Sequence, residues 1–308
     1  MKILVTGGAG FIGSHTVEKL LGSQFPVRVL DNFSTGRPEN LRQQSGLEVQ
    51  IGDIRSIDDV NRAMRGVTHV LHLAAQVSQQ DSVEHPVNSC SHNVRGFVNV
   101  IEAARRGGVQ RFVYASASAV YGNTEDGAVD ELAPTRPLSP YALEKLVNDQ
   151  YGAMYRELYG LSCLGLRYFN VYGPRQDPHT PYAGVVSRFV DCARRGVPLG
   201  IFGDGLQTRD FMYVGDAAEI NRRALMSPYQ GTLNVASGRS VTILDLVDSL
   251  SRCAGRPLAA EHLAPRSGEV RHSAARVHVL ERELGAMPPT GLERGLATML
   301  AAEPALAA

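Results

Sequence analysis

The sequence predicts an α/β fold: a doubly wound, mainly parallel sheet with helices on both faces, followed by a smaller C-terminal lobe. Three observations lead to this prediction. Short apolar runs alternate with helical periodicity through the first half of the chain. A glycine-rich turn joins the first apolar run, residues 2–5, to a helical pattern that begins at Ser14. The 308 residues, 44% of them hydrophobic, suffice for a large domain with an appended lobe.

The glycine-rich turn, T-G-G-A-G-F-I-G over residues 6–13, has the form of a dinucleotide-binding loop. A strand that turns tightly into a helix presents free N–H groups and the positive end of the helix dipole, where a diphosphate can bind. Gly7 permits the turn, Gly10 lets the backbone approach the diphosphate, and Gly13 lets the helix lie close to the sheet. An ordinary glycine-rich turn is the alternative, but the flanking strand and helix favour a Rossmann-type sheet.

Asp31 follows the second predicted strand, 27–30, at about the twenty-residue offset usual for a ribose-binding carboxylate. Its carboxylate can accept hydrogen bonds from the adenosine ribose and would repel a 2′-phosphate. The loop that follows is neutral until Arg37. These features favour NAD over NADP as the cofactor, although a solvated turn aspartate is an alternative.

Composition argues against several classes of partner. Thirty-one basic residues balance thirty-one acidic ones, so no global field favours nucleic acid or an anionic membrane. No apolar run approaches the length of a membrane span, and a first strand at residue 2 leaves no room for a signal peptide, so we expect a cytoplasmic protein. The four cysteines lie far apart, without metal-ligand spacing, and we expect reduced, buried thiols and no metal site.

The third predicted strand, 47–51, ends close to Asp53. This aspartate either holds the adenine amino group or caps a helix that begins near Ser56. Sequence alone leaves both interpretations open.

The fourth predicted strand, 70–73, runs into the small residues 74–76, where a cofactor can lie against the backbone. His72 within this strand is more typical of a core histidine than of a catalyst. A long helix is predicted from about Ser91 to Arg106. Its Asn93 either steadies the strand end above the cofactor or is a plain helix asparagine.

The fifth predicted strand, 111–115, runs into the serine-rich turn S-A-S-A-V-Y-G at 116–122. Farther on, a Ser-Pro pair typical of a helix start precedes Tyr141, and Lys145 follows one turn later on the same helix face. An ammonium beside a phenol favours the phenolate, so the pair predicts a general base poised near neutral pH. In isolation, Y-x-x-x-K is usually a surface pair.

Together these motifs resemble the extended short-chain dehydrogenases/reductases, and specifically the NAD-dependent nucleotide-sugar 4-epimerases that act on UDP-hexoses and UDP-N-acetylhexosamines. The likeness covers nearly the full length. Its motifs are T-G-G-A-G-F-I-G (6–13), S-P-Y-A-L-E-K (139–145), R-Y-F-N-V-Y-G-P-R-Q-D-P (167–178), G-D-G-L-Q-T-R-D-F (203–211) and R-S-G-E-V-R-H-S (266–273). The first two specify the superfamily, and the last three narrow it toward sugar nucleotides.

The resemblance implies two groups of binding residues. NAD would contact Gly7, Gly10, Phe11, Ile12, Gly13, Asp31, Asn32, Ser34, Gly36, Asp53, Ile54, Leu73, Ala74, Ala75, Gln76, Asn93, Ala115, Tyr141, Lys145 and Tyr168. A UDP-sugar would contact Ala117, Ser118, Tyr141, Asn170, Arg209, Arg266 and Ser273, with the two arginines on its phosphates. The implied domains are an NAD-binding domain over 1–170, with a late return near 211–238, and a substrate-binding lobe over 171–308.

The resemblance also implies the reaction. Tyr141 would take the proton from the sugar's O4, a 4-keto sugar would form and turn over, and tightly bound NAD would be regenerated. A homodimer would form through helices near 91–106 and 141–159. Ser273 would face the sugar's C2 substituent, where a small residue admits an N-acetyl group; a surface serine in a loop is the alternative.

One position departs from the pattern. The resembling epimerases carry a hydroxyl, usually serine, four residues before the tyrosine of V-Y-G, and here that position is Ala117. Its neighbours Ser116 and Ser118 are candidate catalytic donors, but alternate residues of a strand face opposite ways. Three explanations stay open: an engineered serine-to-alanine change, local geometry that turns a neighbour inward, or a native enzyme without that donor.

The same turn argues against two sister reactions. Sugar-nucleotide 4,6-dehydratases carry an Asp-Glu pair just before V-Y-G, and UDP-glucuronate decarboxylases carry a glutamate in the second slot. Here those positions hold Ser118 and Ala119, neither of them a carboxylate. The remaining alternatives are a net oxidoreductase, a uronic-acid epimerase, and a non-catalytic protein that binds NAD or a sugar nucleotide.

Overall fold

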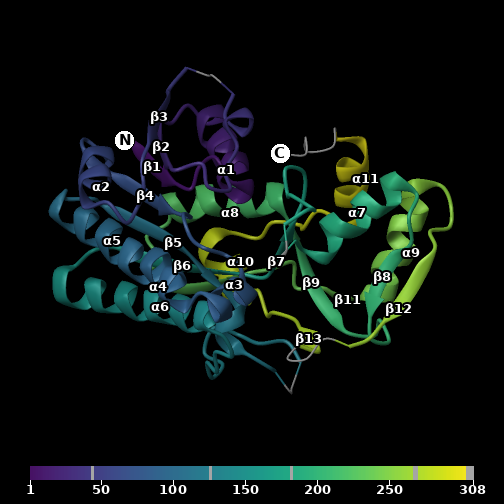
Figure 1. Ribbon diagram of the computed structural model, residues 1–308. Coiled ribbons are helices and arrows are strands. Elements are labelled where there is room, and N and C mark those ends of the chain that lie inside the picture. The colour runs from purple at the N-terminus through teal and green to yellow at the C-terminus, as the bar shows by residue number, and fades with distance from the viewer. Residues whose placement is uncertain (43–44, 125–126, 181–182, 266–269, 303–308) are drawn as a thin grey trace.

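Figure 1 shows the computed structural model of the chain, which describes residues 1–42, 45–124, 127–180, 183–265 and 270–302. Its centre is a seven-stranded parallel sheet with the strand order β10-β6-β5-β4-β1-β2-β3. The strands are β1 (Ile3–Thr6), β2 (Val27–Asp31), β3 (Leu47–Ile51), β4 (His69–His72), β5 (Arg111–Ala117), β6 (Cys163–Tyr168) and β10 (Gly231–Val235). The predicted doubly wound fold is confirmed, and the strand order reverses between β1 and β4, where such sheets bind ligands.

Helices cover both faces of this sheet (Figure 1). One face carries α2 (Ile57–Met64), α5 (Gly96–Arg106) and α6 (Pro140–Tyr159), and the other carries α1 (Phe11–Gly22), α8 (Val214–Met226) and α10 (His278–Leu284). Leu4 and Val70 pack toward the α5 face, whereas Val5 and Leu71 pack toward α1 and α8. Strands buried on both faces have continuous apolar sequences, which is why the sequence predicts them so clearly.

The helix predicted from Ser91 to Arg106 belongs to a longer helical run. It comprises α3 (Gln79–Glu84), α4 (Pro86–Cys90), the π-helical turn η2 (Ser91–Arg95) and α5. A π turn widens the hydrogen-bond ladder and often marks a functional position. The predicted start of α6 is confirmed, because Ser139 Oγ accepts a hydrogen bond from the backbone N–H of Ala142 at 3.2 Å.

The smaller lobe is built around β9 (Thr208–Tyr213). The strands β7 (Asn170–Tyr172), β11 (Ser240–Thr242) and β13 (His272–Ser273) pair with β9, and β8 (Leu199–Phe202) pairs with β12 (Ala260–Leu263). The helices α7 (Val185–Arg195), α9 (Ile243–Ala254) and α11 (Leu292–Ala301) pack against these strands. Two 3-10 turns complete the described elements, η1 (Pro38–Asn40) and η3 (Ser118–Tyr121).

The chain returns to the main sheet after it has entered the lobe. β9 leads directly into α8, whose apolar side chains pack with those of α1, and β10 then pairs in parallel with β6. This return lies within the range 211–238. Because of it, a division into an NAD-binding domain and a lobe near residue 170 stays a proposal.

None of the described helices is both long and apolar enough to cross a membrane. All four cysteines are free, but only Cys163 is buried. Cys90, at the end of α4, is exposed, and Cys192 and Cys253 lie half-buried on helices of the lobe. The prediction of buried thiols is therefore wrong for these three, because each helix leaves part of its surface to solvent.

Candidate active site

The glycine loop supports the start of α1. Gly7 has a φ of +71°, and a Cβ on it would lie 2.7 Å from the backbone nitrogen of Ala74, so only glycine lets the ends of β1 and β4 approach this closely. A Cβ on Gly13 would collide with the carbonyl oxygen of Gly7. Helix α1 begins at Phe11 without a side-chain cap on its first N–H groups. This cradle of backbone donors fits a diphosphate.

Asp31 is buried at the end of β2. Its Oδ2 accepts from the N–H of Ala9 at 2.9 Å, and its Oδ1 accepts from the N–H of Phe33 at 2.8 Å. Each oxygen keeps a lone pair that a ribose hydroxyl could use. A Cβ on Gly36 would lie 2.8 Å from that of Ala9 and 3.1 Å from Asp31 Oδ1. The solvated-turn alternative is therefore wrong, because Asp31 joins the glycine loop to residues 32–37, which we name the ribose-side loop.

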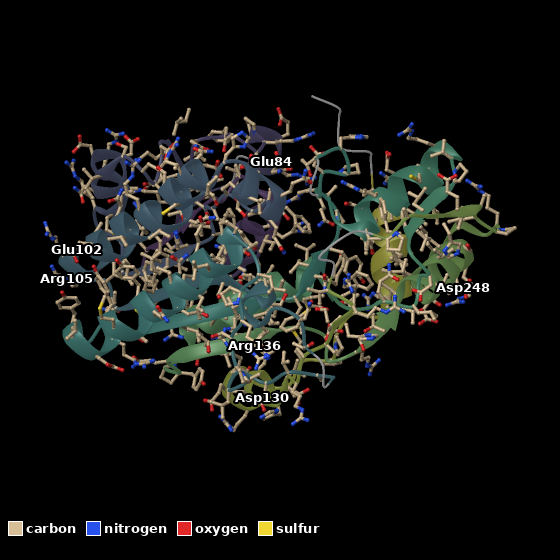
Figure 2. All side chains as sticks on the ribbon, turned by 60° about the horizontal axis from the view of Figure 1, so that its bottom comes forward. Glu84, Glu102, Arg105, Asp130, Arg136 and Asp248 are labelled. Carbon is tan, nitrogen blue, oxygen red and sulfur yellow. The ribbon has the colours of Figure 1, made fainter. Side chains whose placement is uncertain are left out.

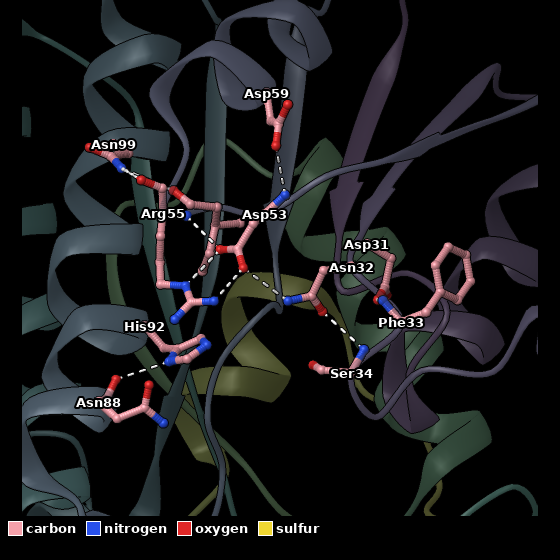
Figure 3. A network of polar contacts seen from close by, with 11 residues as sticks. Asp31, Asn32, Phe33, Ser34, Asp53, Arg55, Asp59, Asn88, His92 and Asn99 are labelled. Carbon is pink, nitrogen blue, oxygen red and sulfur yellow. Dashed lines mark hydrogen bonds and ion pairs between the residues drawn. The ribbon is translucent and has the colours of Figure 1, made fainter.

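Asp53 lies beside the ribose-side loop (Figure 3). Its carboxylate accepts from Arg55 Nε and Nη2 at 3.0 and 2.7 Å and from Asn32 Nδ2 at 3.1 Å. The Arg55 hydrogen bonds, above all, hold the pKa of this carboxyl well below its usual range. The cap of α2 is Ser56, whose Oγ accepts from the N–H of Asp59 at 3.3 Å. The N-cap interpretation of Asp53 is therefore wrong, and adenine recognition stays a proposal.

The backbone that follows β4 is hydrogen-bonded to a side chain of the π turn η2. Asn93 Oδ1 accepts from the N–H of Gln76 at 2.9 Å, and Asn93 Nδ2 donates to the Gln76 carbonyl at 2.9 Å. Nδ2 also donates at 2.7 Å to Glu144 Oε2, a buried carboxylate on α6 that accepts from Ser89 Oγ at 2.7 Å. Asn93 thus steadies the strand end at Leu73, Ala74 and Ala75, and the plain-asparagine alternative is wrong.

His72 is a core histidine, as predicted. It is hydrogen-bonded through Nδ1 to Thr6 Oγ1 at 2.8 Å and packs against the rings of Phe97 and Phe112. Burial, assisted by the nearby Lys145 charge, lowers its pKa to about 3. It therefore stays neutral at physiological pH.

Tyr141 and Lys145 lie on the first two turns of α6, against the end of β5. Lys145 Nζ donates to the carbonyl of Ala115 at 3.0 Å and lies 5.7 Å from the centre of the Tyr141 ring. The N–H of Tyr141 donates to Ser82 Oγ at 3.1 Å. Lys145 is buried and Tyr141 half-buried, so the surface-pair alternative is wrong.

The electrostatics of this pair differ from the prediction. Burial raises the pKa of Tyr141 to about 12, and Glu144 acts in the same direction. Burial also lowers the pKa of Lys145 to about 8. This pKa does not support the prediction of a general base poised near neutral pH, because desolvation of the phenolate and the Glu144 charge both act against ionisation of Tyr141.

The two candidate donors beside Ala117 lie in different surroundings. Ser116 is buried next to Asp149 of α6, on the strand face shared with Tyr114. Ala117 ends β5, and Ser118 opens η3 in a half-buried position. Because the alternation of the strand turns Ser116 into the layer between the sheet and α6, the geometry does not support it as a donor to a sugar. Ser118 stays a candidate.

Three of the predicted substrate residues meet in the lobe. The β-pairing places Ser273 of β13 beside Arg209 of β9. Asn170 Nδ2 donates to the carbonyl of Asp210 at 3.0 Å and lies 3.5 Å from Ser273 Oγ. Arg266 lies outside the described residues.

A cavity of about 580 Å³ opens beside β9, within the size range of small-molecule sites. At its rim, Arg271 donates two hydrogen bonds to the Asp204 carboxylate at 2.8 and 2.7 Å. Its lining mixes apolar and polar side chains: Phe202, Gly203, Asp204, Gln207, Leu263, Pro265, Val270 and Arg271.

The sequence profile described as the NAD dependent epimerase/dehydratase family matches residues 3–236. The chain belongs to this family. It is 41% identical over 296 residues to a putative UDP-glucose 4-epimerase of Methanocaldococcus jannaschii, a match that covers 96% of this chain and 95% of the relative.

Two solved structures match this family member along nearly its whole length. A Thermus thermophilus UDP-glucose 4-epimerase in complex with NAD has a TM-score of 0.90 at 40% identity and covers 97% of this chain and 98% of that one. A UDP-N-acetylglucosamine 4-epimerase from Methanobrevibacter ruminantium, in complex with UDP-N-acetylmuramic acid, has a TM-score of 0.93 at 34% identity and covers 97% and 96%. The resemblance seen in the sequence is confirmed.

Two of the residues predicted to contact NAD direct their side chains elsewhere in this family member. Tyr168 OH donates to Asn221 Oδ1 of α8 at 2.5 Å, and a Cβ on Gly96 would lie 2.6 Å from the Ile54 side chain. The Tyr168 hydroxyl is thus bonded to α8 and the Ile54 side chain packs against Gly96, so contacts of these two residues with NAD stay predictions. Glu144 was missed by sequence reasoning, although its place between Tyr141 and Lys145 in S-P-Y-A-L-E-K was a usable signal.

The cofactor preference can be tested directly in this epimerase/dehydratase. We expect NAD to co-purify with the protein, because the glycine loop and Asp31 form a preorganised site, and we expect turnover without added NAD. Calorimetry on the cofactor-depleted protein should show NAD binding more tightly than NADP, since the Asp31 carboxylate repels a 2′-phosphate. Tighter binding of NADP would refute the Asp31 argument.

Proposed function

We propose that this chain interconverts the C4 epimers of a UDP-sugar and returns its NAD unchanged. The observation that carries the proposal is the Tyr141–Lys145 pair, packed against the end of β5 at the sheet edge where the glycine loop also lies. The epimerase names of the relatives support the same reaction class.

Residues of this chain would bind the cofactor and transfer the proton in separate roles. Bound NAD supplies the hydride acceptor and a positive charge. Gly7, Gly10 and Gly13 would hold its diphosphate and Asp31 its ribose, while Lys145 would keep an ammonium near Tyr141. Tyr141 would hold the proton exchanged with the sugar's O4, and the 4-keto sugar would turn over before hydride returns to its other face.

The lobe would hold the rest of the substrate. Asn170 and Arg209 are proposed to bind the sugar diphosphate, since Arg209 offers a planar donor fork suited to phosphate oxygens. The cavity bordered by Phe202 and Gln207 lies beside the strand that carries Arg209 and is proposed to take the nucleoside. Anchoring through the nucleotide would leave the hexose free to turn at Tyr141.

Ser273 is proposed to decide which hexose fits. Its hydroxyl lies 3.5 Å from Asn170 Nδ2, beside another residue proposed to bind the substrate. This position favours a role of Ser273 in selecting the C2 substituent over the alternative of a surface serine in a loop. A serine leaves room for an acetamide at C2 and can offer it a hydrogen bond. We therefore propose UDP-GlcNAc and UDP-GalNAc as substrates in addition to UDP-Glc and UDP-Gal.

Ser273→Tyr should remove activity on the acetylated pair selectively, because the larger side chain clashes with the acetamide. Proton NMR of products from all four UDP-sugars should show the wild type interconverting the acetylated pair at least as efficiently as the plain pair by kcat/KM. Ser273→Ala is the matched control and should keep both activities. Equal losses on both pairs in Ser273→Tyr, or a wild type confined to plain hexoses, would refute the proposed role of Ser273. Accumulation of NADH would indicate a net oxidoreductase.

We also propose a homodimer. The side chains of Val83, Val87 and Leu143 on α3, α4 and α6 are 62%, 85% and 51% exposed, an apolar surface that suits a helical interface. This surface lies on α6 and on the two short helices that precede 91–106; Glu102 and Arg105 of α5 stand at the end of the molecule opposite Asp248 (Figure 2).

Leu143→Glu should convert the dimer to a monomer in light scattering after size-exclusion chromatography, since a charge would be buried in the interface. Leu132→Glu is the control, because Leu132 is 95% exposed on the loop between η3 and α6 and belongs to none of the three helices that form this surface. A monomeric wild type would contradict the proposed dimer.

A further inference from the structure

The segment 174–177, which follows β7, contacts helix α1 of the seven-stranded sheet and its helices, which we name the cofactor half. His15 Nε2 donates to the carbonyl of Pro174 at 2.9 Å. Arg175 Nη2 pairs with Glu18 Oε1 at 2.5 Å, one turn farther along the helix. The segment therefore lies along the first turns of α1.

The same segment also reaches the ribose-side loop. Arg37 Nη2, at the end of that loop, pairs with Asp177 Oδ2 at 2.8 Å, although 140 residues separate them in sequence. Asp177 Oδ1 accepts from the N–H of His179 at 2.8 Å, which orients the carboxylate. The two side chains are 26% and 31% exposed, so solvent screens this pair less than a fully exposed one.

The ribose-side loop is in turn fastened to the glycine loop. The N–H of Arg37 donates to the carbonyl of Ala9 at 3.1 Å, and Asn40 Nδ2 donates to the same oxygen at 2.9 Å. Ala9 directly precedes Gly10 and α1, whose first N–H groups form the diphosphate cradle. The Arg37–Asp177 pair thus joins two segments that are both anchored at the start of α1.

The segment's backbone shows that this arrangement is held in place. Arg175 has a φ of +68°, a left-handed conformation that is unfavourable for a residue with a Cβ. Such a conformation persists when surrounding contacts fix it. His15, Glu18 and Arg37 supply those contacts from the cofactor half.

We propose that Asp177 is a positioning residue of the dinucleotide site, whose ion pair with Arg37 fastens segment 174–177 to the ribose-side loop and slows the release of NAD. The inference rests on the NAD site of the proposed function but not on the identity of the sugar. An epimerase that regenerates its cofactor in place gains from such retention, because loss of the reduced cofactor, NADH, between hydride removal and return would leave a keto sugar behind.

The test is a double-mutant cycle on the release of NAD from the holoenzyme. The protein is loaded with the fluorescent analogue etheno-NAD, and its release is followed after addition of excess NAD. Asp177→Asn and Arg37→Gln should each speed release by about two- to fivefold, the range for a partly exposed ion pair. The double variant should release no faster than the faster single variant, because both changes remove one interaction.

Three controls separate this role from a general loss of structure. Asp177→Glu, which keeps the charge, should release the analogue more slowly than Asp177→Asn. Arg252→Gln breaks the Arg252–Glu293 pair of the lobe (2.8 Å) and should leave release unchanged. Raising the ionic strength from about 0.05 to 0.5 M should speed release from the wild type more than from the variants.

Unchanged release in both single variants, or additive effects in the double variant, would overturn the proposal. Because no sugar enters the assay, the result is distinct from that of the proposed function. A wild type that retains NAD but epimerises no sugar refutes the proposed function alone. An active wild type whose variants retain NAD equally well refutes only the proposed role of the Arg37–Asp177 ion pair.

Discussion

Tyr141→Phe should abolish detectable epimerisation, since removing a positioned general base costs about 10²- to 10⁴-fold in rate. Phenylalanine fills the same volume, and the backbone hydrogen bond from residue 141 to Ser82 Oγ stays available, so α6 and the NAD content should be preserved. The measurement is kcat by proton NMR, together with the NAD content of the purified protein. Tyr155→Phe, on the same helix with its hydroxyl bonded to Glu102, is the matched control and should keep activity.

The pH dependence of the wild type follows from the same pair. Burial raises the pKa of Tyr141, so a higher pH increases the phenolate fraction and should increase kcat. Burial lowers the pKa of Lys145 to about 8. Above that pH the ammonium is lost, so the increase in kcat should level off. A kcat that falls steadily between about pH 6 and 8 would contradict Tyr141 as the base. So would activity that survives in Tyr141→Phe.

Ala117→Ser should raise kcat by about a hundred- to a thousandfold if the alanine replaces a catalytic donor, the usual effect of one positioned hydrogen-bond donor. KM should change little, since the added interaction would act mainly in the transition state. Ala119→Ser, the same change two residues on in η3, is the matched control and should have no such effect.

An unchanged kcat in Ala117→Ser would mean that another group already donates this hydrogen bond. Ser118 is then the group to test, because Ser116 is buried beside Asp149. In that case Ser118→Ala should lower kcat by a similar factor. If neither variant changes kcat, the enzyme works without a hydroxyl donor at this turn.

Local patterns were enough to predict most of the cofactor half. Glycine spacing predicted the turn into α1, because a positive φ at Gly7 and the close approach at Gly13 depend on a few neighbouring residues. The Tyr141–Lys145 pair was predictable for the same reason, since a helix start and a four-residue spacing place both side chains on one face. Asp31 was predicted from its position after an apolar strand.

Local sequence patterns do not predict contacts between distant segments, and only the family resemblance placed Asn170 and Ser273 in one site. Ser273 and Asn170 lie 103 residues apart, and Arg37 and Asp177 lie 140 residues apart, yet each pair is in contact. Their proximity depends on how β13 and the segment after β7 pack, and no periodicity or cap encodes that packing. Of the two interpretations that the sequence leaves open for Asp53, the N-cap is wrong because Ser56, three residues on, caps α2.

Sequence patterns alone predict the strands and helices in the first half of the chain, the glycine loop and the spacing of Tyr141 and Lys145, because burial periodicity, turn chemistry and helix spacing act over a few residues. The surroundings of those groups depend on the tertiary structure. The folded chain places Ser116 next to Asp149, bonds Asn93 to Gln76, and desolvates the Tyr141 hydroxyl, which raises its pKa. Solvation and charge at one atom depend on every segment packed around it, and that packing is a property of the whole fold.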